Sequence, residues 1–365
     1  MKKINIDLIA GARPNFMKIA SIINAISQKS LKNKISYRLI HTGQHYDANM
    51  SESFFEQLNI PNPHYNLESG SGSQAEQTSR IMIGYEKILK NQNVDCCLVV
   101  GDVTSTLACS IVAKKLNIKV AHVEAGIRSG DMAMPEEINR IVTDSISDYF
   151  FTTSDNANKS LLAQGANPKN IFFVGNTMID TLLANKPNFS KPSIWDKAKL
   201  KDKQYLIMTL HRPANVDNSL RLKSFVMETI NNSNEKPIIF PMHPRTKKQF
   251  SKLGINNSNF YTIEPLGYFE FNYLVERCMA VITDSGGITE ETTVMDVPCM
   301  TLRDNTERPE TIEMGTNMLL GTNPSAIKPA LKELFSGSWK SGSIPPLWDG
   351  KAGQRIAEHL IKIFK

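Results

Sequence analysis

The sequence predicts an α/β protein built from two Rossmann-like, doubly wound domains. Two observations support this prediction. Short apolar runs alternate with stretches of helical spacing along most of the chain, and this alternation is interrupted once, near residue 183. Strands that alternate with helices are typical of parallel sheets covered by helices on both faces. A chain of 365 residues also exceeds what one compact core usually holds, so two domains are expected.

The first half of the chain contains six strand-like runs. Stretches with helical spacing follow some of them, for example at residues 17–27 and 105–116. Parallel strands of this kind place their carboxyl ends at one edge of the sheet, where ligands of doubly wound proteins bind. The six runs lie at residues 4–11, 36–43, 95–102, 119–126, 149–155 and 171–176.

The segment from Leu182 to Gln204 is rich in Pro, Lys and Asn, a composition typical of a linker or a surface helix. Strand-like runs then resume at residues 205–211, 236–243, 260–267, 280–287 and 298–304. We therefore expect a first domain at residues 1–182 and a second at 183–350. Apolar residues at helical spacing predict a closing helix at 351–365 that packs back on the first domain. Two such halves favour a ligand site at the domain interface.

Composition limits the classes of partner. The net charge of +6 is mild, and no dense basic run interleaves with aromatic residues, which argues against nucleic acid and leaves room for a small anion. No apolar run approaches the roughly 20 residues of a membrane helix, and the amino terminus lacks a signal-peptide pattern, so a cytoplasmic protein is expected. The five cysteines lack metal-ligand spacing and are expected to be buried free thiols.

Carboxylates follow two consecutive predicted strands of the first domain. Asp102 ends one apolar run and Glu124 ends the next, while Glu136 comes just after Pro135 at the expected start of a helix. Each acid has a structural alternative: Asp102 suits a helix cap, and Glu136 suits an ion pair with Arg140 one turn later. Two acids at the ends of neighbouring strands nevertheless favour a functional site at this edge of the sheet.

Cations and small residues complete the pattern. Arg13 and Lys18 open a helix after the first strand, an arrangement that suits either an anion site or an ordinary turn. In the second domain, His211 and His243 each end an apolar strand and each lies close to an arginine. The most specific local signal is the run "TDSGGITEE", whose small residues allow a phosphate to approach the N-terminus of a helix. That run contains Ser285, Gly286, Gly287 and Glu291.

Taken together, these motifs resemble the non-hydrolysing UDP-N-acetylglucosamine 2-epimerase family, which has a glycosyltransferase B type fold. Nine motifs occur in order over nearly the whole chain, among them "GARPNFMK", "HVEAGIRSGD", "TDSGGITEE" and "RDNTERPETIEMGTN". The resemblance implies catalytic roles for Asp102, Glu124, Glu136 and His211. It also implies substrate-binding roles for Arg13, Lys18, His243, Phe271, Ser285, Gly286, Gly287, Glu291 and Arg308.

The resemblance further implies a reaction without a redox cofactor or a metal. UDP leaves C1 as the C2 proton is removed, and UDP and a proton then add back to the opposite face of a 2-acetamidoglucal. Some members bind a second UDP-sugar as an activator, and Gln44, His45 and Arg80 match that region. A homodimer is implied as well. Three alternatives stay open: a 2-epimerase of a UDP-2,3-diacetamido or deoxy amino sugar, a UDP-sugar-dependent glycosyltransferase of the same fold, and a non-catalytic sensor.

Overall fold

The computed structural model describes residues 3–43, 55, 57–90 and 92–365, without the side chain of Arg13. The chain divides into two compact units. Unit 1 comprises Met1–Ala184 together with Pro346–Lys365, and unit 2 comprises Asn185–Pro345. The carboxyl-terminal segment of unit 1 thus begins at Pro346 rather than at residue 351. One reason is Trp348, which is buried and donates a hydrogen bond from its indole nitrogen to the carbonyl of Thr153 at 3.0 Å.

In the described part of unit 1, seven parallel strands form one sheet in the order β3-β2-β1-β4-β5-β6-β7. Strand order reverses between β1 and β4, which makes the carboxyl ends of these two strands the topological switch point. The two-residue strand β3 was not predicted. The strands are β1 (Ile4–Ala10), β2 (Ile35–His41), β3 (Tyr65–Asn66), β4 (Cys96–Val100), β5 (Lys119–Val123), β6 (Tyr149–Thr152) and β7 (Ile171–Phe173).

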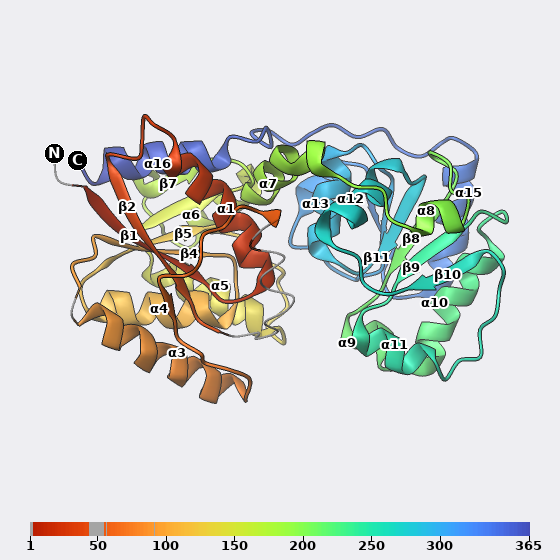
Figure 1. Cartoon of the computed structure of the whole chain (residues 1–365), viewed down its shortest axis with the longest axis horizontal. Helices are drawn as coiled ribbons and strands as arrows, with labels where there is room; N and C mark the ends of the chain where they lie inside the picture. The colour runs from red at the N-terminus through yellow and green to blue at the C-terminus, as the bar shows by residue number, and fades with distance from the viewer. Residues whose placement is uncertain (1–2, 44–54, 56, 91) are drawn as a thin grey trace. The chain divides into compact units, whose positions relative to one another are not determined.

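Helices cover both faces of the unit 1 sheet. In Figure 1, α1 and α16 lie along one face and α3 and α4 along the other. Local chemistry marks several helix starts: Ser73 and Glu76 form a capping box at α3, and Pro135 is the first residue of α5. The helices are α1 (Arg13–Ser27), α3 (Gln74–Leu89), α4 (Thr104–Lys115), α5 (Pro135–Ile146), α6 (Asp155–Ala163), η1 (Pro168–Asn170), α7 (Thr177–Asn185) and α16 (Ala352–Ile363).

The closing helix α16 packs on α1, and two features hold its first turn. The carboxylate of Asp180 accepts hydrogen bonds from the backbone nitrogens of Ala352 at 3.0 Å and Gly353 at 2.7 Å. A Cβ atom on Gly353 would lie 2.6 Å from the carbonyl oxygen of Ser21, so only glycine permits this approach of α16 to α1.

Within the described residues, unit 2 contains a six-stranded parallel sheet in the order β10-β9-β8-β11-β12-β13. Its switch point lies between β8 and β11. The strands are β8 (Leu206–Thr209), β9 (Ile238–Pro241), β10 (Phe260–Ile263), β11 (Ala280–Thr283), β12 (Cys299–Thr301) and β13 (Asn317–Leu319). Two parallel α/β sheets confirm the predicted fold class.

Two apolar clusters hold the helices to the faces of this sheet. One joins the strands to α10 and α15 through residues such as Phe225 and Leu331, and the other joins them to α8 and α12 through residues such as Ile194 and Leu274. The helices are η2 (Lys186–Asn188), α8 (Ile194–Lys197), α9 (Pro213–Val216), α10 (Ser219–Asn231), α11 (Pro244–Phe250), α12 (Tyr268–Arg277), α13 (Gly286–Val294), α14 (Pro309–Glu313), η3 (Pro324–Ala326) and α15 (Ile327–Phe335).

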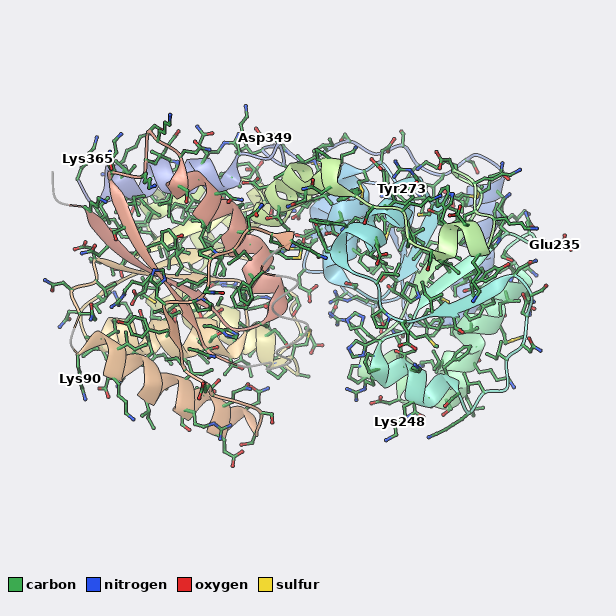
Figure 2. The ribbon with its side chains drawn as sticks, viewed as in Figure 1. Lys90, Glu235, Lys248, Tyr273, Asp349 and Lys365 are labelled. Atoms are coloured by element: carbon green, nitrogen blue, oxygen red, sulfur yellow. The ribbon has the colours of Figure 1, made fainter. Side chains whose placement is uncertain are left out.

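Most charged residues lie at the surface and the cysteines lie in the core, as the composition predicts. Charged side chains such as Lys90, directly after α3, and Lys248, on α11, extend outward from the two units (Figure 2). All five cysteines are buried free thiols, as expected. Across the residues that the structure describes, no helix combines the length and the apolar character needed to cross a membrane.

Candidate active site

The candidate residues of each unit follow the strands at its switch point. In unit 1, α1 follows β1, Asp102 follows β4 and Glu124 follows β5. In unit 2, His211 follows β8 and Ser285 follows β11. Because parallel strands end at the same edge, residues far apart in the sequence meet there.

A buried ion pair links α1 to the end of β5. Lys18 Nζ lies 2.6 Å from Glu124 Oε2, and the two side chains are only 11% and 3% exposed. A Cβ atom on Gly101 would lie 3.1 Å from Lys18 Nζ and 3.9 Å from Glu124 Oε2, so the pair lies beside the turn that leads to Asp102. Lys18, expected to face an anion, is thus paired with one of the candidate catalytic carboxylates.

Glu124 has an unusual backbone conformation. Its φ angle is +68°, a left-handed conformation that a side chain with a Cβ rarely adopts. The backbone nitrogen of Glu124 nevertheless donates to the carbonyl of Phe151 at 2.9 Å. Strain of this kind is concentrated at functional sites, where the surrounding structure holds it in place.

Asn15 fixes the turn between β1 and α1. Its side-chain oxygen accepts hydrogen bonds from the backbone nitrogens of Gly11 at 3.3 Å and Ala12 at 3.0 Å. Its amide nitrogen donates to the carbonyl of Val100 at 2.9 Å. Asn15 therefore ties the end of β4 to the start of α1, next to Lys18.

Asp102 lies against the first turns of α5. Its carboxylate forms an ion pair with Arg140, which also pairs with Glu137 at 2.8 Å. The side chain of Asn139 donates to the backbone carbonyl of Asp102 at 2.8 Å. Arg140 thus pairs with Asp102 and Glu137, and the half-buried Glu136 lies in the first turn of the same helix. The structure brings Asp102 and the turn that carries Glu136 together.

A buried histidine, His122, contacts the backbone next to Asp102 and lies two residues before Glu124. His122 is fully buried in β5, and its ring nitrogens lie 2.7 Å from Asp144 Oδ1 and 2.8 Å from the carbonyl oxygen of Gly101. Asp144 also accepts from the backbone nitrogen of Gly126 at 3.0 Å and pairs with Arg128 at 2.7 Å. Burial opposes the charge of Asp144, but His122 and Arg128 outweigh it and lower the pKa of this carboxyl group.

Both ring nitrogens of His122 therefore face acceptors. The Gly101 carbonyl oxygen can only accept a hydrogen bond, and the Asp144 carboxylate also accepts from the Gly126 backbone nitrogen and from Arg128. Through Asp144, the His122 ring connects the turn at Gly101, which precedes Asp102, with the turn at Gly126, which follows Glu124.

In unit 2, four of the predicted residues line one pocket of about 190 Å³. Its polar side chains are Thr209, His211, His243 and Ser285. The apolar part of the lining includes Phe271, Leu266 and Ile288. A planar ring beside Phe271 and an anion beside the histidines would fit this division between apolar and polar walls.

His211 is held by a fully buried carboxylate. His211 Nδ1 lies 2.9 Å from Asp284 Oδ1. Asp284 also accepts from the backbone nitrogens of His211 and Arg212, at 3.1 Å and 2.9 Å, and from the side chain of Asn215 at 3.1 Å. Burial alone would raise the pKa of Asp284, but these hydrogen bonds and the nearby imidazole lower it, so the carboxyl group is ionised.

His243 lies in the turn before α11. Its Nδ1 accepts a hydrogen bond from the backbone nitrogen of Arg245 at 3.3 Å, and its ring centroid lies 6.2 Å from that of His211. Burial lowers the pKa of His243, and the positive charges of His211 and Arg245 act in the same direction. Arg245 itself forms an exposed ion pair with Asp217 at 2.6 Å.

The small residues predicted to bind phosphate open helix α13. Ser285 is the residue before its first turn, and Gly286 and Gly287 are its first two residues. A Cβ atom on Gly286 would lie 3.4 Å from Arg303 NH1, so this glycine allows a cation to lie close to the helix N-terminus. Free backbone N–H groups and a nearby guanidinium are the features that phosphate sites share.

Buried acids surround the remaining predicted residues of unit 2. The guanidinium of Arg308 pairs with Glu290, the neighbour of Glu291 on α13. The Tyr268 hydroxyl donates to Glu291 at 3.0 Å, while burial raises the pKa of Glu291 to about 7. Burial also raises the pKa of Glu310 on α14 to about 7.

The predicted activator residues fall in a region of which little is described. Gln44 and His45 lie outside the described residues, as does the side chain of Arg13. Arg80, on α3, donates to the backbone carbonyls of Ser69 at 2.6 Å and Ser71 at 2.7 Å. Among the described residues, no group of three or more His, Cys, Asp or Glu side chains is placed to hold a metal ion.

Sequence reasoning missed Asn15, His122, Asp144 and Asp284 as supporting residues. A signal was present for Asp284, which lies inside "TDSGG" at the end of a strand, and for His122, which directly precedes "VEAG". No spacing rule connects His122 with Asp144, because the two residues meet only once α5 packs beside β5.

Comparison with known proteins shows the family of this chain. The sequence model of UDP-N-acetylglucosamine 2-epimerase matches residues 28–361. A UDP-N-acetylglucosamine 2-epimerase of Methanocaldococcus jannaschii is 43% identical over 98% of this chain and 99% of its own length. Its crystal structure in complex with UDP-GlcNAc and UDP superposes with a TM-score of 0.86 at 42% identity, covering 98% of this chain and 100% of that one.

A second activity occurs among the relatives. A UDP-2,3-diacetamido-2,3-dideoxy-D-glucuronate 2-epimerase of Pseudomonas aeruginosa is 38% identical over 97% of this chain and 99% of its own length. Relatives of this identity and coverage, and a family match over nearly the whole chain, establish the relationship. The chain belongs to the UDP-N-acetylglucosamine 2-epimerase family.

Proposed function

We propose that this enzyme inverts C2 of a UDP-linked N-acetylamino sugar, with UDP-GlcNAc and UDP-ManNAc as the substrate pair. The observation that carries this proposal is the unit 2 pocket, where His211, His243, Phe271 and Ser285 come together in a chain of this family. Phe271 suits the uracil ring, and the N-terminus of α13 suits the diphosphate.

The chemistry needs a group that leaves and returns. The C2 proton of the sugar is not adjacent to a carbonyl, and a general base contributes only about 10²–10⁴-fold, so most of the acceleration must come from stabilising the departing UDP. The backbone N–H groups of α13, with Arg303 and Arg308, supply positive charge for this purpose. UDP and a proton then return to the opposite face of a 2-acetamidoglucal.

The carboxylates of unit 1 serve the proton transfers in this proposal. Removing a proton from one face and delivering one to the other requires two differently placed groups. Glu124 beside Lys18, and Asp102 beside Arg140, are held by separate cations at neighbouring strand ends. Glu136, on the first turn of α5, is the third candidate. Arg13 and Lys18 complete this set near the sugar, and Glu291 is assigned to the ribose hydroxyls.

A second substrate has specific support. The Pseudomonas aeruginosa relative is named as acting on a UDP-2,3-diacetamido uronic acid and is 38% identical to this chain. The 43% identity to the Methanocaldococcus jannaschii enzyme favours UDP-GlcNAc as the first candidate. Both substrates require the same inversion at C2, so the residues proposed above apply to either.

Proton NMR of a panel of UDP-amino sugars in heavy water tests the proposal. The expected result is deuterium at C2 in both epimers of one substrate, with no acceptor added. Glu124→Gln is the variant to compare, and it should bind UDP with nearly unchanged affinity while exchange slows by about 100-fold or more. An intact C2–H bond in every substrate of the panel would refute epimerisation, and sugar transfer after an acceptor is added would favour a glycosyltransferase.

Several broader features accompany the proposal. A homodimer in the cytoplasm, supplying an activated sugar for polysaccharide synthesis, agrees with the family. An activator site for a second UDP-sugar near Gln44, His45 and Arg80 is also proposed. Gel filtration and the dependence of the initial rate on UDP-GlcNAc concentration test the dimer and the activator, respectively.

A further inference from the structure

The unit 2 pocket contains two imidazoles that are held by opposite kinds of partner. The ring centroids of His211 and His243 lie 6.2 Å apart, and both rings line the same pocket. In each ring, Nδ1 is engaged by the protein itself. The chemical nature of those two partners determines where each ring carries its hydrogen.

For His211, the partner is an acceptor. Asp284 is fully buried and accepts from the His211 backbone nitrogen, from the Arg212 backbone nitrogen and from the Asn215 side chain. An ionised carboxylate can only accept, so His211 Nδ1, at 2.9 Å from Oδ1, carries a hydrogen. Nε2 is then the ring atom that can gain or lose a proton toward the pocket.

For His243, the partner is a donor. The backbone nitrogen of Arg245 donates to Nδ1 at 3.3 Å, so this atom carries a lone pair and the hydrogen lies on Nε2. The titratable and charged groups around the ring are His211, Arg245 and Asp284, and burial together with His211 and Arg245 lowers the pKa of His243, which favours its neutral form. His243 therefore presents a neutral Nε2–H donor.

We infer that Asp284 and the Arg245 backbone N–H hold the two imidazoles in opposite tautomers, so that His211 can exchange a proton through Nε2 while His243 only donates a hydrogen bond. Asp284 is thereby a positioning residue that acts through His211. The inference rests on the proposed function only in taking the ligand to be the diphosphate of a UDP-sugar. The Nε2 proton of protonated His211 would pass to the diphosphate as UDP detaches, which balances the negative charge that develops there, and it would return to Nε2 when UDP adds back.

Nitrogen-15 NMR of the uniformly labelled full-length chain measures the tautomers directly. At about pH 8, long-range proton–nitrogen correlations should show His211 with its hydrogen on Nδ1 and His243 with its hydrogen on Nε2. His64 is a built-in reference, because its Nδ1 accepts from the backbone nitrogen of Leu39 at 3.0 Å, as His243 accepts from Arg245. His211→Asn and His243→Asn assign the two signals. A hydrogen on Nε2 of neutral His211, or on Nδ1 of His243, would overturn the inference.

Matched substitutions test the two roles through binding. Asparagine replaces histidine near Nδ1 and glutamine replaces it near Nε2, so His243→Gln keeps a neutral donor toward the pocket and His243→Asn does not. UDP affinity measured by calorimetry should therefore fall about 10-fold further in His243→Asn than in His243→Gln. Equal losses in the two variants would contradict the donor role.

Asp284→Asn tests the positioning role. This variant should show a mixture of His211 tautomers and should lose kcat by a larger factor than it raises KM. Unchanged tautomers and kcat would overturn the inference. If Asp284→Asn does not fold, the wild-type spectrum still decides the tautomers. The two proposals can fail separately. If the tautomers are as expected but no C2 hydrogen exchanges, the proposed function is refuted and this inference is supported.

Discussion

Lys18 Nζ and Glu124 Oε2 lie 2.6 Å apart in a nearly fully buried ion pair that joins α1 to the end of β5. Burying two charges is favourable only when each compensates the other, so the cost of removing one partner exceeds the gain from forming the pair. The Lys18 ammonium compensates the carboxylate of Glu124, which we propose as a base for the C2 proton.

Lys18→Met should lower both stability and turnover. Removing the ammonium leaves a buried carboxylate without its cation, which costs about 3 kcal/mol of unfolding free energy in urea denaturation. The double variant Lys18→Met/Glu124→Gln should recover part of that stability but no turnover. Lys90→Met is the control, because Lys90 forms an exposed pair with Glu86 at 3.4 Å. Full turnover in Lys18→Met would show that the reaction does not require the ion pair between Lys18 and Glu124.

His122→Gln should disturb the turns that carry Asp102 and Glu124. The fully buried His122 ring is replaced by a shorter amide, so Asp144 and the Gly101 carbonyl lose the ring that contacts both of them. We expect a stability loss of about 3 kcal/mol and a kcat that falls more than UDP affinity, because the pocket that we propose for UDP lies in unit 2. The matched control is Lys119→Met at the start of the same strand, where the pair with Asp148 is half exposed. A proportional loss of kcat and UDP affinity would indicate general unfolding instead.

Gly126→Ala should lower the free energy of unfolding far more than Gly165→Ala does. Both glycines have positive φ angles, +79° and +83°, so alanine is strained at either position by about 1 kcal/mol. A Cβ atom on Gly126 would also lie 2.3 Å from the carbonyl oxygen of Ala157, whereas a Cβ atom on Gly165 meets open space. Urea unfolding of the two variants measures the difference. Similar losses would show that the turn after Glu124 can shift at little cost.

Glu310→Gln should stabilise the enzyme above about pH 7. Burial raises the pKa of Glu310 to about 7, so the folded state favours the protonated form. The free energy of unfolding is then highest below the unfolded-state pKa and falls as the pH rises through 7. Glutamine resembles the protonated acid and does not titrate. Melting temperatures should rise at about pH 8 and change little at about pH 5, with the exposed Glu313→Gln as the control. A lower melting temperature at pH 8 would mean that the ionised acid is stabilised by Arg308.

The sequence predicted the two sheets and the strand ends that carry the site, because alternation of apolar strands with helices determines both. Four predicted residues, His211, His243, Phe271 and Ser285, indeed line one pocket. The family and fold predictions are confirmed, while the catalytic and binding roles of individual residues stay predictions.

The partners of these residues could not be predicted. Lys18 pairs with Glu124 across more than a hundred residues of sequence, and that choice depends on how β1, β4 and β5 align in the sheet. Arg140 was weighed as a partner of Glu136, but it pairs with Asp102 and Glu137, because α5 packs beside β5 and α4 and so reaches the residue that follows β4. Helical spacing shows which residues are near in one helix and says nothing about a neighbouring strand.

Unit 1 is built from two separate segments of the chain, and this has a consequence for biosynthesis. Its closing helix α16 belongs to the segment Pro346–Lys365, while unit 2 is one continuous segment, Asn185–Pro345. A ribosome therefore finishes all of unit 2 before it releases the twenty residues that complete unit 1. Until then, the surface of α1 that receives Gly353 stays uncovered, so the nascent amino-terminal half is the part of the chain that a chaperone would need to protect.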